Sequence, residues 1–182
     1  KLEETNKGFK RLSRICKECL KWVRCLKKMT EKRIYYVKPR QVVLVTSRYN
    51  FDNNIITIGW HTRVSSRPEL YAIAVSKYRY SYKLIKKGKC FVINFMDVKD
   101  KKIAEYCGAI SGREVNKFEK LNLEREICNN VECFRLKKAL AYMECKLIKE
   151  VKLKSSNYII FIGEVVNKAV VKEGRRLLWS EG

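Results

Sequence analysis

Short apolar runs alternate with polar or glycine-containing turns along most of the chain after Pro39, and they are rich in Val, Ile, Tyr and Phe. Runs of this kind are typical of β-strands. We predict six strands, at 41–47, 54–61, 70–76, 90–95, 143–153 and 158–170. Between them, the pattern predicts a short helix at 81–88 closed by Gly88, and two helical pieces within 98–123 that are interrupted near Gly108 and Gly112.

The predicted strands lack the strand–helix–strand alternation that is typical of a parallel sheet. Six strands in this order favour a closed or nearly closed antiparallel barrel, because closure removes vulnerable sheet edges. We therefore expect a mainly β fold with helical insertions, an antiparallel six-stranded barrel that occupies residues 29–182.

Residues 1–28 have a different pattern, with apolar side chains at helical spacing and ten Lys or Arg against three Glu. One apolar stripe on a basic helix could dock on the barrel, on a partner or on anionic lipid, and we favour docking on the barrel. We therefore predict a basic amphipathic N-terminal extension.

The composition is that of one core domain with a strong positive charge. The 182 residues carry 41 Lys or Arg against 19 Asp or Glu, a formal net charge of +22. Such a charge favours an anionic partner without naming it. No apolar run is long enough for a membrane helix, and residues 1–28 lack a continuous apolar signal segment, so we expect a cytoplasmic protein with no membrane partner.

Several kinds of site are disfavoured by the residues that are missing. The eight glycines form neither a dinucleotide-binding fingerprint nor a P-loop, and His61 is the single histidine. Sites that need two imidazoles are therefore excluded. Cys16, Cys19 and Cys25 contain a C-x-x-C spacing, but they lie on the predicted helix of residues 1–28 with no obvious fourth ligand nearby. We therefore favour helix packing over a zinc or iron–sulfur site and predict no metal. Most of the eight cysteines read as buried free thiols, with a disulfide between two of Cys128, Cys133 and Cys145 as an alternative.

Two predicted helix starts could hold a phosphate group. Arg79 and Ser81 lie where the strand 70–76 gives way to the helix at 81–88, and a helix start offers free N–H groups and a positive dipole end. The sequence SGRE, residues 111–114, is the second predicted helix start, since Ser111 and Glu114 have capping-box spacing. Arg113 would share a helix face there with a residue four positions later, Lys117. On the residues alone, an ordinary helix cap is the more frequent explanation of either start.

The sequence TIGWHT, residues 57–62, ends a predicted strand with a glycine and an aromatic residue. Gly59 would let a flat ligand approach the backbone, and Trp60 could pack on that ligand. The alternative is a strand bulge followed by a core tryptophan, with His61 as an ordinary packed or surface histidine.

The order of these motifs resembles the flavin reductase-like family with the FMN-binding split barrel. The resemblance covers about residues 38–171 and rests on PRQVVLVTSR, NIITIGWHTRVSSRPELYAIAVS, RYSYKLI, FVIN and YCGAISGREVNKF. Members of this family include flavoredoxins, archaeal ferric reductases and the reductase components of two-component monooxygenases. The resemblance implies a homodimer with FMN near the subunit interface.

The resemblance also implies which residues hold the cofactor. The isoalloxazine ring would be bordered by Thr57, Gly59, Trp60, His61 and Thr62. The ribityl phosphate would be bound by Ser76, Arg79, Tyr80, Ser81 and Tyr82. The site would be closed by Ser111, Gly112, Arg113 and Lys117, with Cys107 close to it.

The function implied is that of an FMN-binding flavoprotein oxidoreductase, which passes electrons from NADH or NADPH to a small acceptor such as free flavin or ferric iron. The flavin itself does the chemistry, so no catalytic side chain is expected. One alternative is an FMN electron carrier that serves a protein partner. Another is a basic nucleic-acid-binding β-barrel, which the net charge and ten tyrosines would allow. We disfavour it because the charge is spread along the whole chain.

Overall fold

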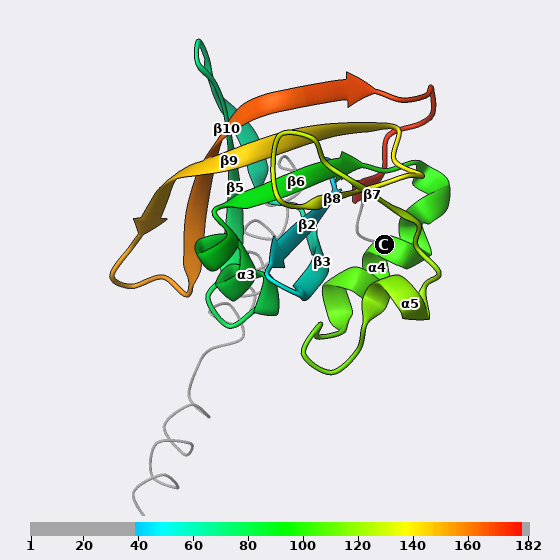
Figure 1. The fold of residues 1–182 in the computed structure, drawn as a ribbon, viewed down its shortest axis with the longest axis horizontal. Helices are drawn as coiled ribbons and strands as arrows, with labels where there is room; N and C mark the ends of the chain where they lie inside the picture. Colours follow the sequence, from blue (N-terminus) through cyan, green and yellow to red (C-terminus); the bar gives the residue numbers. More distant parts are fainter. Residues whose placement is uncertain (1–38, 180–182) are drawn as a thin grey trace, which may run out of the picture. The chain divides into compact units, whose positions relative to one another are not determined.

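Seven strands form one antiparallel sheet with the order β3-β2-β6-β9-β10-β5-β4 (Figure 1). The computed structural model describes residues 39–179, and the predicted helix of residues 1–28 with its C-x-x-C spacing lies outside them. The strands of the sheet are Val43–Tyr49 (β2), Asp52–Ile58 (β3), His61–Ser66 (β4), Glu69–Ser76 (β5), Cys90–Phe95 (β6), Ala141–Lys152 (β9) and Tyr158–Val170 (β10).

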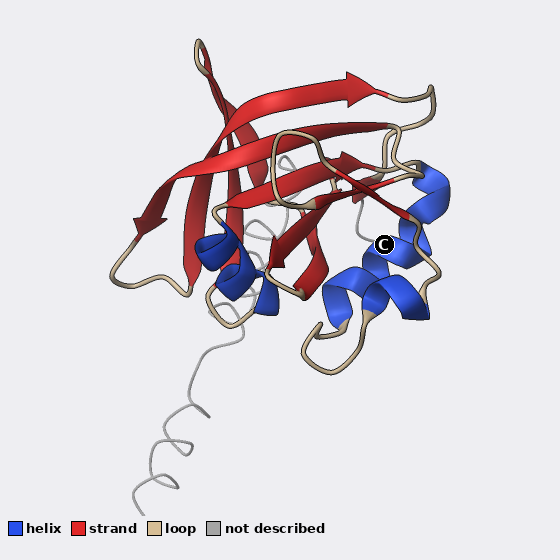
Figure 2. Cartoon of the chain, viewed as in Figure 1, coloured by secondary structure: helices blue, strands red, loops and turns tan. Residues whose placement is uncertain are grey.

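The sheet curls into a split barrel because its two edge strands are consecutive in the chain. Only Gly59 and Trp60 separate β3 from β4, so the two edges of the sheet must come together at this connection. The edges are nevertheless not hydrogen-bonded to each other, since β3 pairs with β2 and β4 pairs with β5. Figure 2 shows the strands curving around a common interior, with the helices outside.

Two short strand pairs and four helical segments complete the described part of the chain. The short pairs are Arg40–Gln41 (β1) with Leu178–Trp179 (β11), and Arg125–Ile127 (β7) with Phe134–Leu136 (β8). The helical segments are Tyr80–Gly88 (α3), Val98–Asp100 (η2, a 3-10 turn), Lys101–Ala109 (α4) and Lys117–Lys120 (α5). None of these helices is long and apolar enough to cross a membrane.

Apolar side chains from both faces of the sheet form separate buried clusters. Val43, Val45 and Ile56 point into the barrel interior, whereas Leu44 and Ile55 pack outward against α4 and α5. Because β2 and β3 are covered on both faces, their sequences read as continuous apolar runs.

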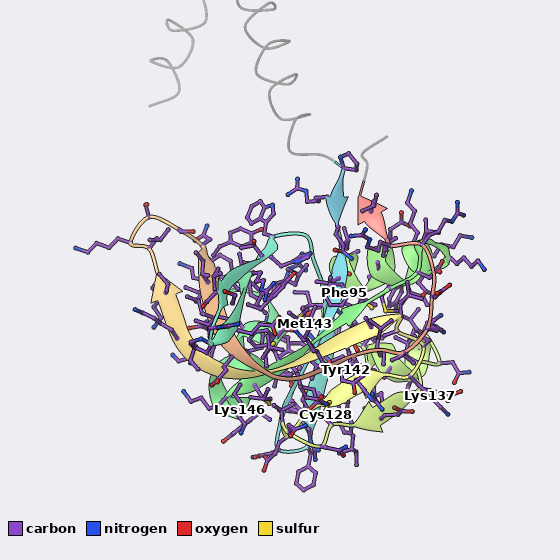
Figure 3. The ribbon with its side chains drawn as sticks, turned by 90° about the horizontal axis from the view of Figure 1, so that it is seen from above. Phe95, Cys128, Lys137, Tyr142, Met143 and Lys146 are labelled. Atoms are coloured by element: carbon purple, nitrogen blue, oxygen red, sulfur yellow. The ribbon has the colours of Figure 1, made fainter. Side chains whose placement is uncertain are left out.

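A third cluster lies outside β6 and β9. On β9, Tyr142 joins this cluster, while its neighbour Met143 packs against the barrel interior (Figure 3). Adjacent strand residues point to opposite faces of a sheet, so a single strand serves both layers.

The predicted mainly β split-barrel fold is confirmed, and all six predicted strands are present with shifts of a few residues at their ends. The sequence-based prediction missed β4, the seventh strand of the sheet. Its sequence, HTRVSS, has one apolar residue, Val64, and most of its side chains are exposed. β4 forms because its backbone pairs with β5. Backbone pairing does not require alternating apolar side chains, so the sequence gives no signal for this strand.

The predicted helix at 81–88 is confirmed as α3, but its ending differs. Gly88 is the last helical residue, and Lys89 follows in the left-handed conformation with φ 56°. A Cβ atom at Gly88 would overlap the backbone carbonyl of Arg48 on β2. Gly88 is therefore required for close packing of α3 on the sheet and not for a left-handed helix cap.

The helical prediction for 98–123 is correct in outline, and the interruption lies at Gly112, as predicted, but not at Gly108. Gly108 belongs to α4, and the break is the turn at 110–116. The second helix begins only at Lys117, where the Asn116 side chain accepts a hydrogen bond from the Phe118 amide, with an N···O distance of 3.2 Å. Asn is a favoured N-cap because its carbonyl oxygen satisfies a free helical N–H group.

His61 on β4 links the barrel strand β5 to the short strand β1, which belongs to a separate strand pair, through its two ring nitrogens. Nδ1 lies 2.8 Å from the Tyr71 hydroxyl on β5, and Nε2 lies 3.0 Å from the Gln41 carbonyl on β1. The neutral imidazole with its proton on Nε2 satisfies both contacts, since Nε2–H donates to the carbonyl and Nδ1 accepts from the hydroxyl. Burial lowers the pKa of His61 below its usual 6.5, and the contact with Gln41 only partly opposes this effect.

We predict that Gly88→Ala destabilises the fold by about 1–3 kcal/mol, because the new methyl group would force α3 away from Arg48. Urea unfolding of both proteins measures the change in the free energy of unfolding. Gly108→Ala is the matched control in a helix, where the new Cβ would lie 3.3 Å from the Thr57 Cβ atom. Its loss should be smaller, since alanine also gains roughly 1 kcal/mol in helix propensity. Equal losses in the two variants would contradict the packing argument.

We also predict that His61 makes the fold less stable in acid. Its pKa is lower in the folded than in the unfolded chain, so the unfolded chain binds more protons between the two pKa values. The free energy of unfolding should therefore fall as the pH drops below about 6.5. His61→Gln lacks this titration, and denaturation of both proteins from pH 7 to pH 5 isolates it. The same pH slope in both proteins would show that His61 does not contribute.

Candidate functional site

Two adjoining cavities follow the exposed side of β3, and both are lined by Ile56 and Arg79. The first has a volume of about 180 Å³ and is lined by Ile56, Thr57, Ile58, Gly59, Trp60, Ala74, Ser76, Arg79, Gly108 and Tyr158. The second has a volume of about 350 Å³ and is lined by Asn54, Ile56, Tyr78, Arg79, Tyr80, Cys107, Ile110, Ser111, Gly112, Arg113, Glu114 and Lys117. The two cavities share Ile56 and Arg79, and together they are called the groove.

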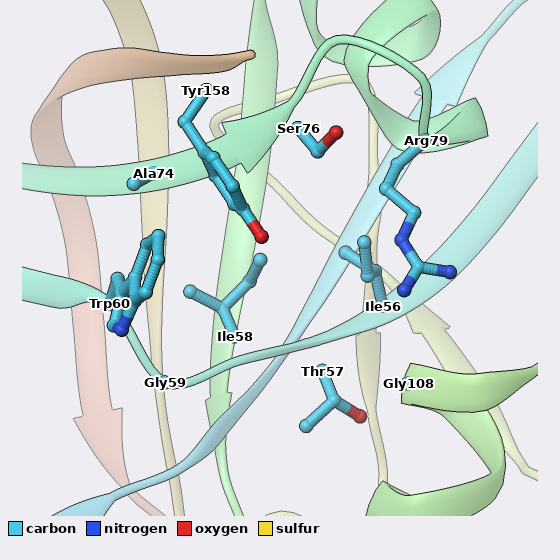
Figure 4. Close-up of a pocket in the computed structure, with 10 residues that line it drawn as sticks. All are labelled: Ile56, Thr57, Ile58, Gly59, Trp60, Ala74, Ser76, Arg79, Gly108 and Tyr158. Carbon is cyan, nitrogen blue, oxygen red and sulfur yellow. The ribbon is translucent and has the colours of Figure 1, made fainter. Parts of the chain in front are cut away.

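The first cavity has an aromatic end and a cationic end. Figure 4 shows Trp60 and Tyr158 together at one end and the Arg79 side chain at the other. The two aromatic rings have centroids 4.7 Å apart and are tilted by 49°. Between them the cavity follows the backbone of β3, whose outer edge has no strand partner. The cavity therefore offers a flat ligand both ring surfaces and unpaired peptide groups.

The cationic end coincides with the start of α3. Arg79 is the N-cap residue, in an extended conformation, and no side chain caps the helix. The first turn contains no acidic residue, so the N–H groups and the positive end of the helix dipole are not neutralised there. Ser76 lies just before this start and lines the first cavity. This end of the groove can bind an anionic group.

The second cavity adds further positive charge around the same helix start. The Arg113 guanidinium donates to the Tyr78 carbonyl at 3.1 Å and lies 5.7 Å from the centre of the Tyr80 ring. Gly112 packs so closely on Asn54 that a Cβ atom there would overlap the Asn54 side chain. Close packing at Gly112 thus holds the turn that carries Arg113 against β3.

Lys117 is the buried cation of the second cavity, with only 3% of its surface exposed. Its Nζ donates to the carbonyls of Ile55 and Cys107, at 2.9 Å and 2.8 Å. Burial lowers the pKa of Lys117, while burial raises the pKa of the Cys107 thiol to about 11. Cys107 therefore remains a protonated thiol at neutral pH.

The turn at 111–114 differs from the predicted helix start. The Ser111 hydroxyl accepts from the Arg113 amide, and α5 begins only at Lys117, so the predicted capping box with Glu114 does not form. Arg113 and Lys117 consequently do not share a helix face. They line the same cavity because the turn folds back over β3.

The groove brings together eleven of the fifteen predicted site residues. These are Thr57, Gly59, Trp60, Ser76, Arg79, Tyr80, Cys107, Ser111, Gly112, Arg113 and Lys117. Whether any of them contacts a flavin stays a prediction.

The other four predicted residues lie beside the groove and do not line it. His61 points to Tyr71 and Gln41, and the exposed Thr62 hydroxyl contacts its neighbour's backbone. Ser81 is buried and accepts from the Asn54 amide at 2.9 Å, so it supports a lining residue. Tyr82 turns away, with its hydroxyl 3.0 Å from a Glu150 carboxylate oxygen.

The sequence analysis missed Tyr158 and Asn54 as lining residues. Tyr158 follows Trp60 by nearly a hundred positions and begins β10, which pairs with β5. No local motif marks it, because its place beside Trp60 follows from strand pairing. Asn54 opens the predicted strand 54–61, where a polar residue at a strand end could have been suspected.

Comparison with known proteins yields consistent matches. The family model described as flavin reductase like domain matches residues 36–182. A protein of Archaeoglobus fulgidus is 30% identical over 132 residues, which make up 72% of this chain and 73% of that protein. The flavoredoxin of Desulfovibrio vulgaris (Miyazaki F) is 25% identical, with a TM-score of 0.67 over 73% of this chain and 70% of its own.

A further solved structure supports the fold alone. The FMN-binding protein of Thermus thermophilus with bound 1-cyclohex-2-enone is 24% identical, with a TM-score of 0.67 over 75% of this chain and 73% of its own. The family model matches most of the chain, and the two solved structures have a fold similar to the barrel of this chain. The chain therefore belongs to the family of proteins with a flavin reductase like domain.

Proposed function

We propose that the chain binds FMN in the groove along β3 and passes electrons from NADH or NADPH to a small acceptor such as free flavin or ferric iron. The main observation behind this proposal is the composition of the groove. One end is lined by aromatic rings and the β3 backbone, and the other end lies at the cationic start of α3. A flavin mononucleotide has the matching parts, a flat ring system and a terminal phosphate. Membership of the family with a flavin reductase like domain and the similarity to a flavoredoxin support a flavin cofactor.

The donors in the groove fit a phosphate dianion. Three cations line it, Arg79, Arg113 and Lys117, against one carboxylate, that of Glu114. Ser76 adds a hydroxyl, and the first turn of α3 adds backbone N–H groups. Arg79 and Arg113 would hold the phosphate, since guanidinium groups bind phosphate oxygens in pairs.

The ring system would lie where β3 has no strand partner. Bound FMN accepts a hydride and releases electrons singly or in pairs. The protein would orient the ring between the β3 backbone and the Trp60–Tyr158 pair. The buried positive charge of Lys117 would favour a negatively charged reduced ring. No side chain needs to act as a catalytic acid or base.

We further propose that a second copy of the chain covers the aromatic end of the groove. Trp60, Val64 and Tyr158 are large apolar side chains with 52%, 48% and 41% of their surface exposed. Trp60 lies in the β3–β4 connection, Val64 lies on β4, and Tyr158 begins β10, which is separated from β4 by β5. Light scattering on a size-exclusion column tests this proposal. A dimer that Val64→Glu converts to a monomer would support it, and a wild-type monomer would refute it.

Two other functions make different predictions. An FMN electron carrier that serves a protein partner would hold flavin but would not accept electrons from a nicotinamide. A nucleic-acid-binding barrel would bind RNA or DNA in a salt-dependent manner and would hold no flavin.

We predict that Arg79→Ala weakens FMN binding by roughly 10–100-fold and leaves riboflavin binding unchanged. Loss of one charge-assisted hydrogen bond costs about 1.5–3 kcal/mol, and riboflavin lacks the phosphate that Arg79 would contact. Quenching of flavin fluorescence measures both affinities. Arg175→Ala is the matched control, because Arg175 is exposed and lines neither cavity. Equal weakening for both ligands would place the phosphate elsewhere.

We predict that the purified protein with FMN shows oxidised-flavin absorption that bleaches when NADH or NADPH is added without oxygen. A stopped-flow spectrometer follows the bleaching, with free FMN at the same concentration as the control. Bound flavin that stays oxidised would favour the carrier function. A protein that does not bind FMN at all would refute the proposal that the chain is a flavoprotein.

A further inference from the structure

Three buried thiols lie together outside the barrel, in the cluster that also contains Tyr142 (Figure 3). Cys90 begins β6, while Cys128 and Cys133 border the loop that joins β7 to β8. All three are free thiols, and none of them lines the proposed flavin groove. The described residues hold no group of three His, Cys, Asp or Glu side chains arranged to bind a metal. These thiols therefore have no role in the function proposed above.

The β7–β8 hairpin carries Cys133 to the side chain of Cys90. Pairing of Ile127 with Phe134 places Cys128 opposite Cys133, and the Cys128 amide donates to the Cys133 carbonyl at 3.0 Å. Cys133 and Cys90 pack in the same buried cluster, and the neighbouring Cys133 side chain is the main cause of a lowered pKa at Cys90. Two thiols from segments more than forty positions apart are thus in contact in the fold.

Glu144 on β9 fixes the loop between Cys128 and Cys133. Its side chain is buried, and one carboxylate oxygen accepts from the Asn130 amide at 3.1 Å while the other accepts from the Asn167 side chain at 3.0 Å. The loop is therefore held against the sheet, and the contact between Cys133 and Cys90 is a feature of the folded chain.

The surroundings of Cys90 favour a thiolate. The Cys133 side chain lowers the pKa of Cys90, with smaller help from the Glu132 backbone amide and the charge of Arg48, while burial and the Glu132 carboxylate partly oppose this effect. Burial instead raises the pKa of Cys128 to about 12. Arg48 and Glu132 also line a cavity of about 440 Å³, whereas Cys90 itself is buried, with 3% of its surface exposed. Cys90 is thus the thiol best placed to react as a nucleophile.

We propose that Cys90 and Cys133 form a reversible intramolecular disulfide when the protein meets a small-molecule disulfide as oxidant. The Cys90 thiolate attacks one sulfur of the oxidant, which forms a mixed disulfide and releases one thiolate. The Cys133 thiolate then attacks the Cys90 sulfur, which forms the Cys90–Cys133 bond and releases the second thiolate. The two cysteine protons go to the two released thiolates, so the protein pair loses two electrons and the oxidant gains them.

The bond would close a loop that contains part of the flavin groove. Residues 90–133 include α4, α5 and the turn between them, which supply Cys107, Arg113 and Lys117 to the second cavity. A disulfide at the ends of this segment restricts its unfolding. Oxidation would therefore raise the midpoint of thermal unfolding of the full chain.

The test is to oxidise the reduced full-length protein with glutathione disulfide under native conditions. Remaining thiols are alkylated in denaturant before digestion with trypsin. Trypsin releases residues 90–99 and 126–135 as separate peptides, and the second contains both Cys128 and Cys133. We expect mass spectrometry to find these two peptides joined, with a fragmentation pattern that assigns the link to Cys133. Cys145, which faces the barrel interior, should remain a free thiol.

Two variants separate the thiols. Cys128→Ser should keep the link between the two peptides, whereas Cys133→Ser should lose it and retain Cys90 as a mixed disulfide with glutathione. Fragmentation of the wild-type linked peptides gives the same assignment if a variant fails to fold. Unlinked peptides, a bond confined to 126–135, or a link assigned to Cys128 would overturn the proposal.

Discussion

The opening of the sheet between β3 and β4 is the constraint on which the rest of the structure depends. Two residues join these strands, so the barrel must bring its edges together, yet the edges do not pair. The outer edge of β3 therefore keeps peptide groups that no strand satisfies. The chain satisfies part of this edge with Lys117, whose ammonium group binds the Ile55 carbonyl, and leaves the rest facing the groove. The same gap that makes the barrel incomplete makes room for a ligand.

The second requirement is a cover for the outer face of β2 and β3, and α4 and α5 supply it. Their apolar side chains pack on Leu44 and Ile55, which fixes the turn at 110–116 between them over the groove. Arg113 and Lys117 reach the groove because of this packing. The cationic character of the site is therefore a result of how the helices cover the sheet, together with the start of α3 at Arg79.

The sequence predicted the parts of the fold that bury apolar side chains and missed those that depend on backbone pairing. Continuous apolar runs identified β2, β3 and β6, whereas β4 has exposed side chains and left no pattern to find. For the groove, glycine, aromatic and basic residues drew attention to TIGWHT and the start of α3, and the family resemblance implied that they border a cofactor. The structure places most of these residues along the groove. Tyr158 could not be identified, because it reaches Trp60 through the pairing of β10 with β5. The turn at Ser111 was misassigned because capping-box spacing is a local pattern, and the close packing of Gly112 on Asn54 is not.

The contact of His61 with Gln41 makes β1 a support for the wall of the groove. His61 directly follows Trp60, and the preceding Gly59 lies so close to Arg40 that a Cβ atom there would be 3.3 Å from the Arg40 side chain. Arg40 and Gln41 therefore support the connection that carries Trp60, although neither of them lines the groove. The smallest chain that keeps the groove intact must therefore begin before Arg40, although every lining residue comes later in the sequence.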